Sequence, residues 1–258
     1  RTGWYLLFCL FWNVAFFQAL GQIIVAMSVS KWYFCREKSS IGSSTFIKSI
    51  GTSTYHHSGT AAIGSLIIAI VQIIRAMVAK LQEKAKQLDN KIGEALLCCC
   101  QCCLWAFEKF IKFLNKKAYI QTAIFGTSFC TSAKDAFFLI LRNAKRVAGI
   151  SYVSTVLMFV GRICISFITA GVAYILIDSH IGSDLHSPGG PALLVLFIAY
   201  VVGDTFLDIF EMSTETILLC FIADEEMFEG DEVYADGSLR KWFDDYDEEE
   251  KTIMADSE

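Results

Sequence analysis

Four long apolar stretches constrain this chain more than any other feature. They run from Trp4 to Val29, from Thr60 to Val78, from Ile150 to Ile177 and from Ala192 to Phe221. A helix of about 18–20 apolar residues crosses the hydrocarbon core of a bilayer, and lipid offers no partner for an unpaired backbone polar group. The stretches therefore predict spanning helices at about residues 4–29, 60–78, 150–177 and 192–221.

Composition supports the same fold class. The chain has 258 residues, of which 54% are hydrophobic and two are proline, and its mean hydropathy is +0.47. A soluble domain rarely reaches this value. We expect an all-α, polytopic helical membrane protein with one membrane domain, residues 1–223, followed by an acidic tail, residues 224–258. Because the first residue is Arg1 rather than Met, we expect a piece of a longer protein.

Loop charge predicts the topology, because basic residues favour the cytosolic side. Residues 79–149 hold twelve Lys and Arg residues between Lys80 and Arg146, whereas Asp178–Pro191 holds none. Residues 79–149 are thus predicted to be cytosolic, and four crossings also place both ends of the chain, including the C-terminus, in the cytosol. The loop Ser30–Gly59 must then lie outside, although it contains four basic residues. These are Lys31, Arg36, Lys38 and Lys48.

The cytosolic segment 79–149 has helical character. Residues 79–97 and 103–114 alternate apolar and charged residues with helical spacing, which is typical of amphipathic helices at a membrane interface. Ala118–Cys130 is apolar but too short to cross, so it is predicted to be re-entrant or interfacial. Beside apolar helices, this basic charge indicates membrane orientation rather than nucleic-acid binding.

Ionisable residues occur within the third and fourth stretches, where their burial is costly. Arg162 lies mid-way along the third stretch, and four acids in the fourth are spaced four, three and four residues apart on one helix face. The acids are Asp204, Asp208, Glu211 and Glu215. An antiparallel hairpin places Arg162 level with residues 204–211. Two interpretations remain open: a structural ion pair that holds two helices in register, with Arg162 and Asp204 as counter-charges, or a polar lining for a solute path.

Aromatic residues are dense in the first stretch. Trp4, Tyr5, Trp32 and Tyr33 lie near its ends, as in an interfacial belt. Trp12 lies deeper, and an aromatic face near carboxylates suits a quaternary ammonium group. Trp12 is therefore a candidate cation contact, with structural packing as the alternative.

Five of the ten cysteines form one cluster. They are Cys98, Cys99, Cys100, Cys102 and Cys103. No second Cys or His pair nearby completes a zinc site, so no metal is predicted. Palmitoylation beside a membrane and a role as small apolar filler remain as alternatives.

Several segments resemble the choline transporter-like family, and together they cover nearly the whole chain. These segments are Gly64–Arg75, Phe107–Ile120, Ala123–Ala133, Phe137–Asn143, the cysteine cluster before Leu104-Trp105, and Glu215–Phe221. The match is to the C-terminal part of the family. The family pattern has a basic residue at Arg162 and an acid at Glu215, whereas Asp204 and Asp208 match no family position.

The resemblance implies a multi-pass carrier for choline or a related organic cation, in the plasma membrane or an organelle membrane. Together with the buried charges, it makes Trp12, Asp208, Glu211 and Glu215 the candidate substrate contacts. No motif of an enzyme is present, so no catalytic residue or cofactor is predicted. The alternative is a membrane scaffold or regulatory partner protein that acts through its acidic tail, which is otherwise a solvated, disordered segment.

Overall fold

The computed structural model describes residues 2–88, 91–181 and 188–228, together with Tyr234, Gly237, Lys241 and Asp245. Within these residues the chain is helical, with no strand. The elements are α1 (Thr2–Tyr33), η1 (Lys38–Ser40), α2 (Ser43–His56), α3 (Ser58–Gln87), α4 (Lys91–Phe125), α5 (Phe129–Arg142), α6 (Ala144–Ile181) and α7 (Gly189–Met227). Most of the acidic tail, including the run Asp247–Glu250, lies outside the described residues, and so does its predicted disorder.

The four predicted spanning segments are confirmed as long apolar helices. Those able to cross a membrane by length and composition are Thr2–Tyr33, Ser58–Gln87, Ala144–Ser179 and Gly189–Met227. Each extends beyond its apolar stretch, because helical hydrogen bonding continues into polar flanking residues. The chain is therefore an all-α polytopic membrane protein.

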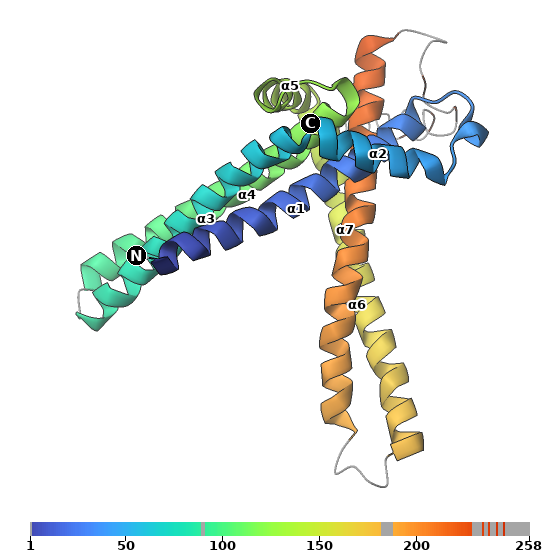
Figure 1. The fold of residues 1–258 in the computed structure, drawn as a ribbon. Helices are drawn as coiled ribbons and strands as arrows, with labels where there is room; N and C mark the ends of the chain where they lie inside the picture. The colour runs from blue at the N-terminus through green and yellow to red at the C-terminus, as the bar shows by residue number, and fades with distance from the viewer. Residues whose placement is uncertain are drawn as a thin grey trace, which may run out of the picture. The chain divides into compact units, whose positions relative to one another are not determined.

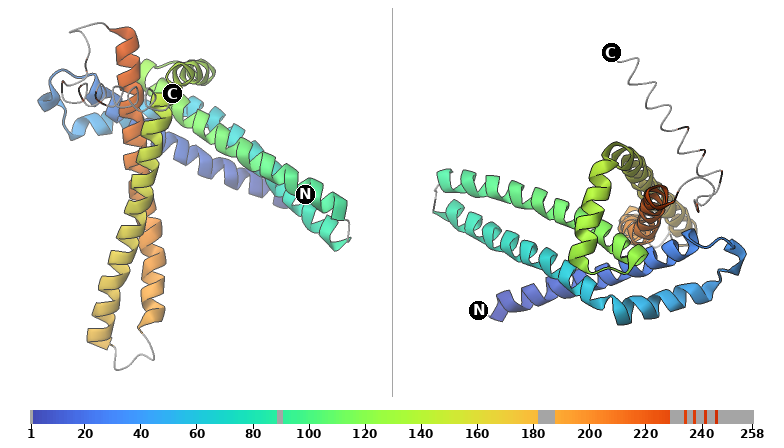
Figure 2. Two further views of the ribbon diagram at one scale, coloured as in Figure 1. Left: turned by 180° about the vertical axis from the view of Figure 1, so that it is seen from behind. Right: turned by 90° about the horizontal axis from the view of Figure 1, so that it is seen from above.

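Two compact units make up the chain. The first contains Arg1–Arg142 and Leu219–Asp244, and the second contains Asn143–Leu218 and Asp245–Glu258. In the first unit, α1, α3 and α4 run side by side (Figures 1 and 2). Their core contains Ala19 and Ile23 of α1, Ala61 of α3, and Ala118 and Tyr119 of α4.

A glycine allows α3 and α4 to approach closely. A Cβ on Gly64 would lie 2.8 Å from Cε2 of Phe129 and would overlap the Tyr119 side chain. At the same point Nδ2 of Asn115 donates a hydrogen bond to the Gly64 carbonyl oxygen at 2.8 Å. The pair of helices is thus fixed by a buried polar contact as well as by apolar packing.

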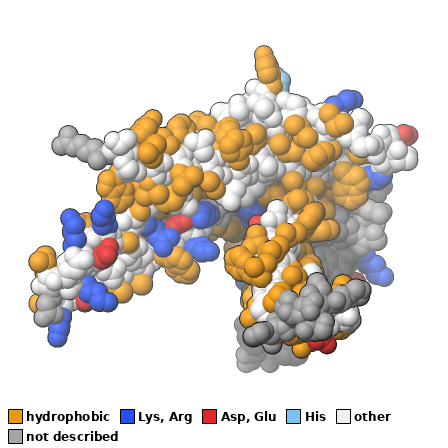
Figure 3. Space-filling model, turned by 60° about the horizontal axis from the view of Figure 1, so that its bottom comes forward, with side chains coloured by type: hydrophobic (Ala, Val, Ile, Leu, Met, Phe, Trp, Pro, Cys, Tyr) orange, Lys and Arg blue, Asp and Glu red, His pale blue; other side chains and the backbone are white. Residues whose placement is uncertain are grey.

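Farther along the same helices, a buried carboxylate joins α3 to α4. Glu108 pairs with Arg75 of α3 and with Lys112 at 2.7 Å, and it accepts a hydrogen bond from Gln72 Nε2 at 3.3 Å. Beyond this cluster, Lys and Arg side chains gather at the end of the α3–α4 hairpin (Figure 3).

The segment Ser30–Gly59, predicted as a loop, contains α2. Its buried residues are Ser49 and Ser53. Lys31 Nζ donates to Ser49 Oγ at 3.4 Å, and Ser53 Oγ donates to Met27 Sδ at 3.7 Å. Because α2 packs on α1 through small polar residues, apolar periodicity does not reveal it.

Candidate functional site

Glycines bring the two helices of the second unit together. A Cβ on Gly161 of α6 would lie 3.4 Å from Leu207 Cδ1, and a Cβ on Gly203 of α7 would lie 3.5 Å from Ile165 Cγ2. Small residues of this kind allow close packing of membrane helices. Each glycine directly precedes a charged residue, Arg162 or Asp204, so the charged groups lie beside these contacts between the helices.

The Arg162 guanidinium is surrounded by carboxylates of α7. Its Nε lies 2.7 Å from Asp204 Oδ1, and its Nη2 donates to Asp208 Oδ1 at 2.8 Å and lies 3.5 Å from Glu211 Oε2. The Arg162 side chain is 16% exposed. The antiparallel register inferred from the sequence thus brings together Arg162 and three of the four acids.

This cluster, Arg162 with Asp204, Asp208 and Glu211, contains more negative than positive charge, because three carboxylates face one guanidinium. Asp208 is the most open, with a side chain 64% exposed in the structure. Glu215 lies one turn farther along α7 and is buried, with 8% exposure. Carboxylates in excess over their cation can attract a second cation.

Trp12 is part of the packing of the first unit. Its indole Nε1 donates to the carbonyl oxygen of Ala62 in α3 at 3.3 Å, and its ring centroid lies 6.2 Å from that of Phe8. The N–H group therefore links α1 to α3. A contact between the ring face and a cation remains a proposal for this residue.

The five clustered cysteines lie on α4. All five are exposed and none forms a disulfide. Among the described residues, no group of three or more His, Cys, Asp or Glu side chains is arranged to hold a metal ion. Because the thiols are exposed, they are accessible to modification, and palmitoylation remains a proposal for these five cysteines.

A sharp turn follows α4. The axes of α4 and α5 meet at 106° across Gly126, Thr127 and Ser128, and Gly126 has a φ of +70°, a left-handed conformation that favours glycine. Ser132 Oγ lies 2.6 Å from Thr127 Oγ1 and accepts from Thr122 Oγ1 at 2.8 Å. These hydroxyl contacts, buried at Thr122 and Ser132, hold the bend. Ala118–Cys130, predicted to be re-entrant or interfacial, therefore contains a break between two helices.

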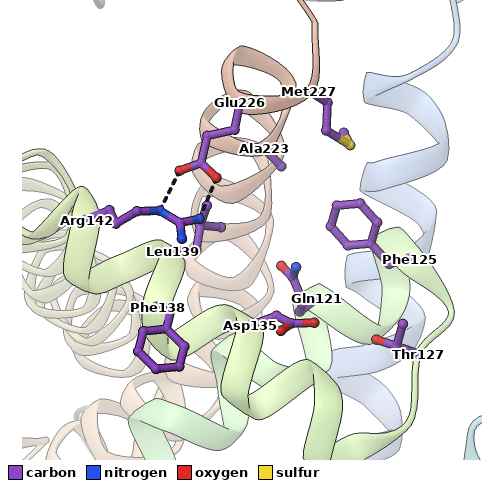
Figure 4. A pocket seen from close by; sticks show the side chains of 10 residues that line it. All are labelled: Gln121, Phe125, Thr127, Asp135, Phe138, Leu139, Arg142, Ala223, Glu226 and Met227. Carbon is purple, nitrogen blue, oxygen red and sulfur yellow. Dashed lines mark hydrogen bonds and ion pairs between the residues drawn. The ribbon is translucent and has the colours of Figure 1, made fainter.

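A pocket of about 400 Å³ lies inside this bend (Figure 4). We call it the elbow pocket. It is lined by Gln121, Phe125, Thr127, Asp135, Phe138, Leu139, Arg142, Ala223, Glu226 and Met227. Arg142 closes one side by donating from Nε to Glu226 Oε1 at 3.2 Å and from Nη2 to Glu226 Oε2 at 2.6 Å. Sequence patterns did not indicate this pocket, because its walls come from three helices.

The contact between Tyr33 and Asp224 was also not predicted. Asp224, assigned to the acidic tail from its sequence, is fully buried in α7. Its Oδ2 accepts hydrogen bonds from Tyr33 Oη at 2.9 Å and from the Tyr234 backbone N–H at 2.9 Å. The guanidinium of Arg36 lies 4.7 Å from the centroid of the Tyr234 ring.

These contacts correct the predicted topology. The sequence places Ser30–Gly59 outside and the tail in the cytosol, yet Tyr33 and Arg36 contact Asp224 and Tyr234. Two segments that touch at or just beyond the ends of spanning helices lie on the same side of the membrane. The two assignments therefore cannot both hold. The prediction counts four crossings, whereas the bent pair α4–α5 can serve as a fifth span by length and composition, and five crossings put both segments on one side. Loop charge alone does not detect such a span.

Comparison with known proteins gives a consistent result. Residues 2–226 match the model of a family described as plasma-membrane choline transporter. The chain is 38% identical over 221 residues to choline transporter-like 2 of Anopheles gambiae, covering 85% of this chain and 28% of that protein. It is also 38% identical over 233 residues to choline transporter-like protein 2 of Danio rerio, covering 88% of this chain and 33% of that protein.

A third relative gives a similar result. Choline transporter-like protein 2 of Dictyostelium discoideum is 38% identical over 236 residues, which cover 90% of this chain and 37% of that protein. The chain thus spans about a third of the length of these relatives.

Proposed function

The chain belongs to the plasma-membrane choline transporter family, and from this premise we propose that the whole protein carries choline or a related organic cation across the plasma membrane. The relatives are named for choline transport, and this chain corresponds to about a third of their length. Its contribution in this proposal is a set of carboxylates that attracts the cation.

The excess of carboxylates around Arg162 carries the proposal. Arg162 pairs with Asp204 and acts as a counter-charge to the acids within an apolar hairpin. Asp208, Glu211 and Glu215 continue along one face of α7, one turn apart, and form a path of negative charge. Removing water from a methylated ammonium group costs less free energy than removing it from a metal ion. A path of carboxylates with aromatic contacts such as Trp12 therefore suits such a cation.

Radiolabelled choline uptake by the full-length protein tests this function. We expect saturable uptake, and we expect Glu211→Gln to lower it about tenfold at low choline concentration, because the variant removes one of the negative charges that attract the cation; tenfold corresponds to about 1.4 kcal/mol. Asp178→Asn is the matched control, because Asp178 is exposed at the end of α6. Absence of saturable uptake by the unchanged protein would refute the function. Equal uptake by the two variants, at equal surface expression, would refute the role of the acid.

A further inference from the structure

The elbow pocket is built from matching faces of three helices. The α5 wall has helical spacing: Phe138, Leu139 and Arg142 follow Asp135 by three, four and seven residues. This spacing places all four on one face of the helix. The other walls follow the same spacing. They are Gln121 and Phe125 on α4, and Ala223, Glu226 and Met227 on α7. All three helical segments belong to the first unit, and the volume of about 400 Å³ is that of a small-molecule site.

One buried polar group in this pocket is unsatisfied. Gln121 is 7% exposed, and within the described part of the chain its Oε1 has no hydrogen-bond partner. A buried acceptor without a donor is destabilising, because it has lost its hydrogen bonds to water. Because Gln121 lines the pocket, a ligand with a hydrogen-bond donor can satisfy this oxygen.

The charge of the pocket favours a cation. The bidentate pair between Arg142 and Glu226 balances one positive against one negative charge, and the Asp135 carboxylate adds a further negative charge. In Figure 4 the polar ends of Gln121 and Asp135 lie between the rings of Phe125 and Phe138. Aromatic rings attract ammonium groups through the negative charge of their faces.

We propose that the elbow pocket binds a small organic cation that carries apolar substituents on its ammonium group and one hydrogen-bond donor. The ammonium group lies against Asp135 and the two Phe rings, and the donor, such as a hydroxyl group, bonds to Gln121 Oε1. A bare metal ion is a poor fit, because it requires oxygen ligands on several sides, whereas much of this wall is apolar. The site is separate in sequence from the Arg162 cluster. Choosing choline as the ligand rests on the proposed function.

Protection of a reporter cysteine tests the site without measuring transport. Met227 lines the pocket and is 44% exposed, so Met227→Cys in the full-length protein introduces a thiol at the pocket. The protein is placed in lipid nanodiscs and treated with N-ethylmaleimide, and mass spectrometry follows the peptide that carries the substitution. We expect choline to slow this modification in a saturable manner, with no effect from sodium chloride at equal ionic strength.

Two variants identify the groups that hold the ligand. Added to Met227→Cys, Asp135→Asn should raise the choline concentration needed for half protection about tenfold, because it removes the carboxylate that attracts the ammonium group; tenfold corresponds to about 1.4 kcal/mol. Gln121→Met should weaken protection by choline but not by tetramethylammonium, which has no hydroxyl group. Glu225→Gln, an exposed neighbour on α7 that does not line the pocket, should leave protection unchanged. Since Asp135 is also exposed, Asp135→Asn is compatible with folding.

The outcomes separate this proposal from the proposed function. Lack of protection in a protein that takes up choline would overturn the elbow site and leave the transport function intact. Protection in a protein without saturable uptake would support the elbow site and refute transport. Equal half-protection concentrations for Asp135→Asn and Glu225→Gln would overturn the assignment of the cation to Asp135.

Discussion

At the scale of single residues, the buried carboxylates of Glu108 and Asp224 are matched to specific donors. Asp224 is fully buried and accepts hydrogen bonds from Tyr33 Oη and from the backbone of Tyr234. Tyr33 lies 191 positions away in the sequence, so composition cannot reveal the pair. Arg162 and Asp204 differ in this respect. They lie on neighbouring helices joined by a short connection, and counting residues from that connection was sufficient to align them.

The Tyr33 hydroxyl should contribute measurably to stability. Tyr33→Phe removes one donor from a buried carboxylate, and leaving such an acceptor short of a partner costs about 1–3 kcal/mol. We expect a lower midpoint temperature of thermal unfolding for the full-length variant in detergent. Tyr55→Phe is the matched control, because the Tyr55 side chain is 83% exposed. Equal midpoints for the two variants would show that the hydrogen bond does not stabilise the fold.

At the scale of elements, apolar pattern was informative for helices that face lipid and uninformative for helices that pack through polar residues. The spanning helices have long apolar runs, and these were predictable. α2 buries Ser49 and Ser53, and the bend before α5 depends on Gly126 and the Ser132 hydroxyl. Such contacts have no periodic signature. The elbow pocket, whose walls come from α4, α5 and α7, could be found only after the fold was known.

The cysteine cluster gives a prediction for α4. All five thiols are exposed, and the adjoining end of the α3–α4 hairpin is basic (Figure 3), which is the setting of palmitoylated cysteines beside a membrane. Replacing these five with Ser should abolish the hydroxylamine-sensitive acyl-exchange signal of the protein in cells. As a control, Ser at Cys9, Cys35, Cys130, Cys164 and Cys220 should retain the signal. The prediction fails if the two variants show the reverse pattern or equal signals.

At the scale of the whole molecule, the ends of two spanning helices constrain the topology. Tyr33, the last residue of α1, donates a hydrogen bond to Asp224 near the end of α7. Arg36, just beyond α1, contacts the ring of Tyr234 beyond α7. Lys38 Nζ also donates to the carbonyl oxygens of Trp32 and Tyr33, each at 2.7 Å. The basic residues of Ser30–Gly59 thus lie on the same side as the tail. If that side is the cytosol, as predicted for the tail, their charge agrees with the preference of basic residues for it.

Labelling with a membrane-impermeant maleimide tests this arrangement. Ser44→Cys lies in α2 and is exposed, and Ser257→Cys lies in the tail. We expect the two substituted thiols of the full-length protein to behave alike in intact cells. Both should resist labelling until the membrane is permeabilised if the tail is cytosolic, as its sequence predicts, because the contact between Tyr33 and Asp224 puts α2 and the tail on one side. The readout is mass spectrometry of the peptide that carries each substitution, which separates it from the native cysteines. Labelling of Ser44→Cys alone in intact cells would restore the arrangement inferred from loop charge and contradict the contact between Tyr33 and Asp224.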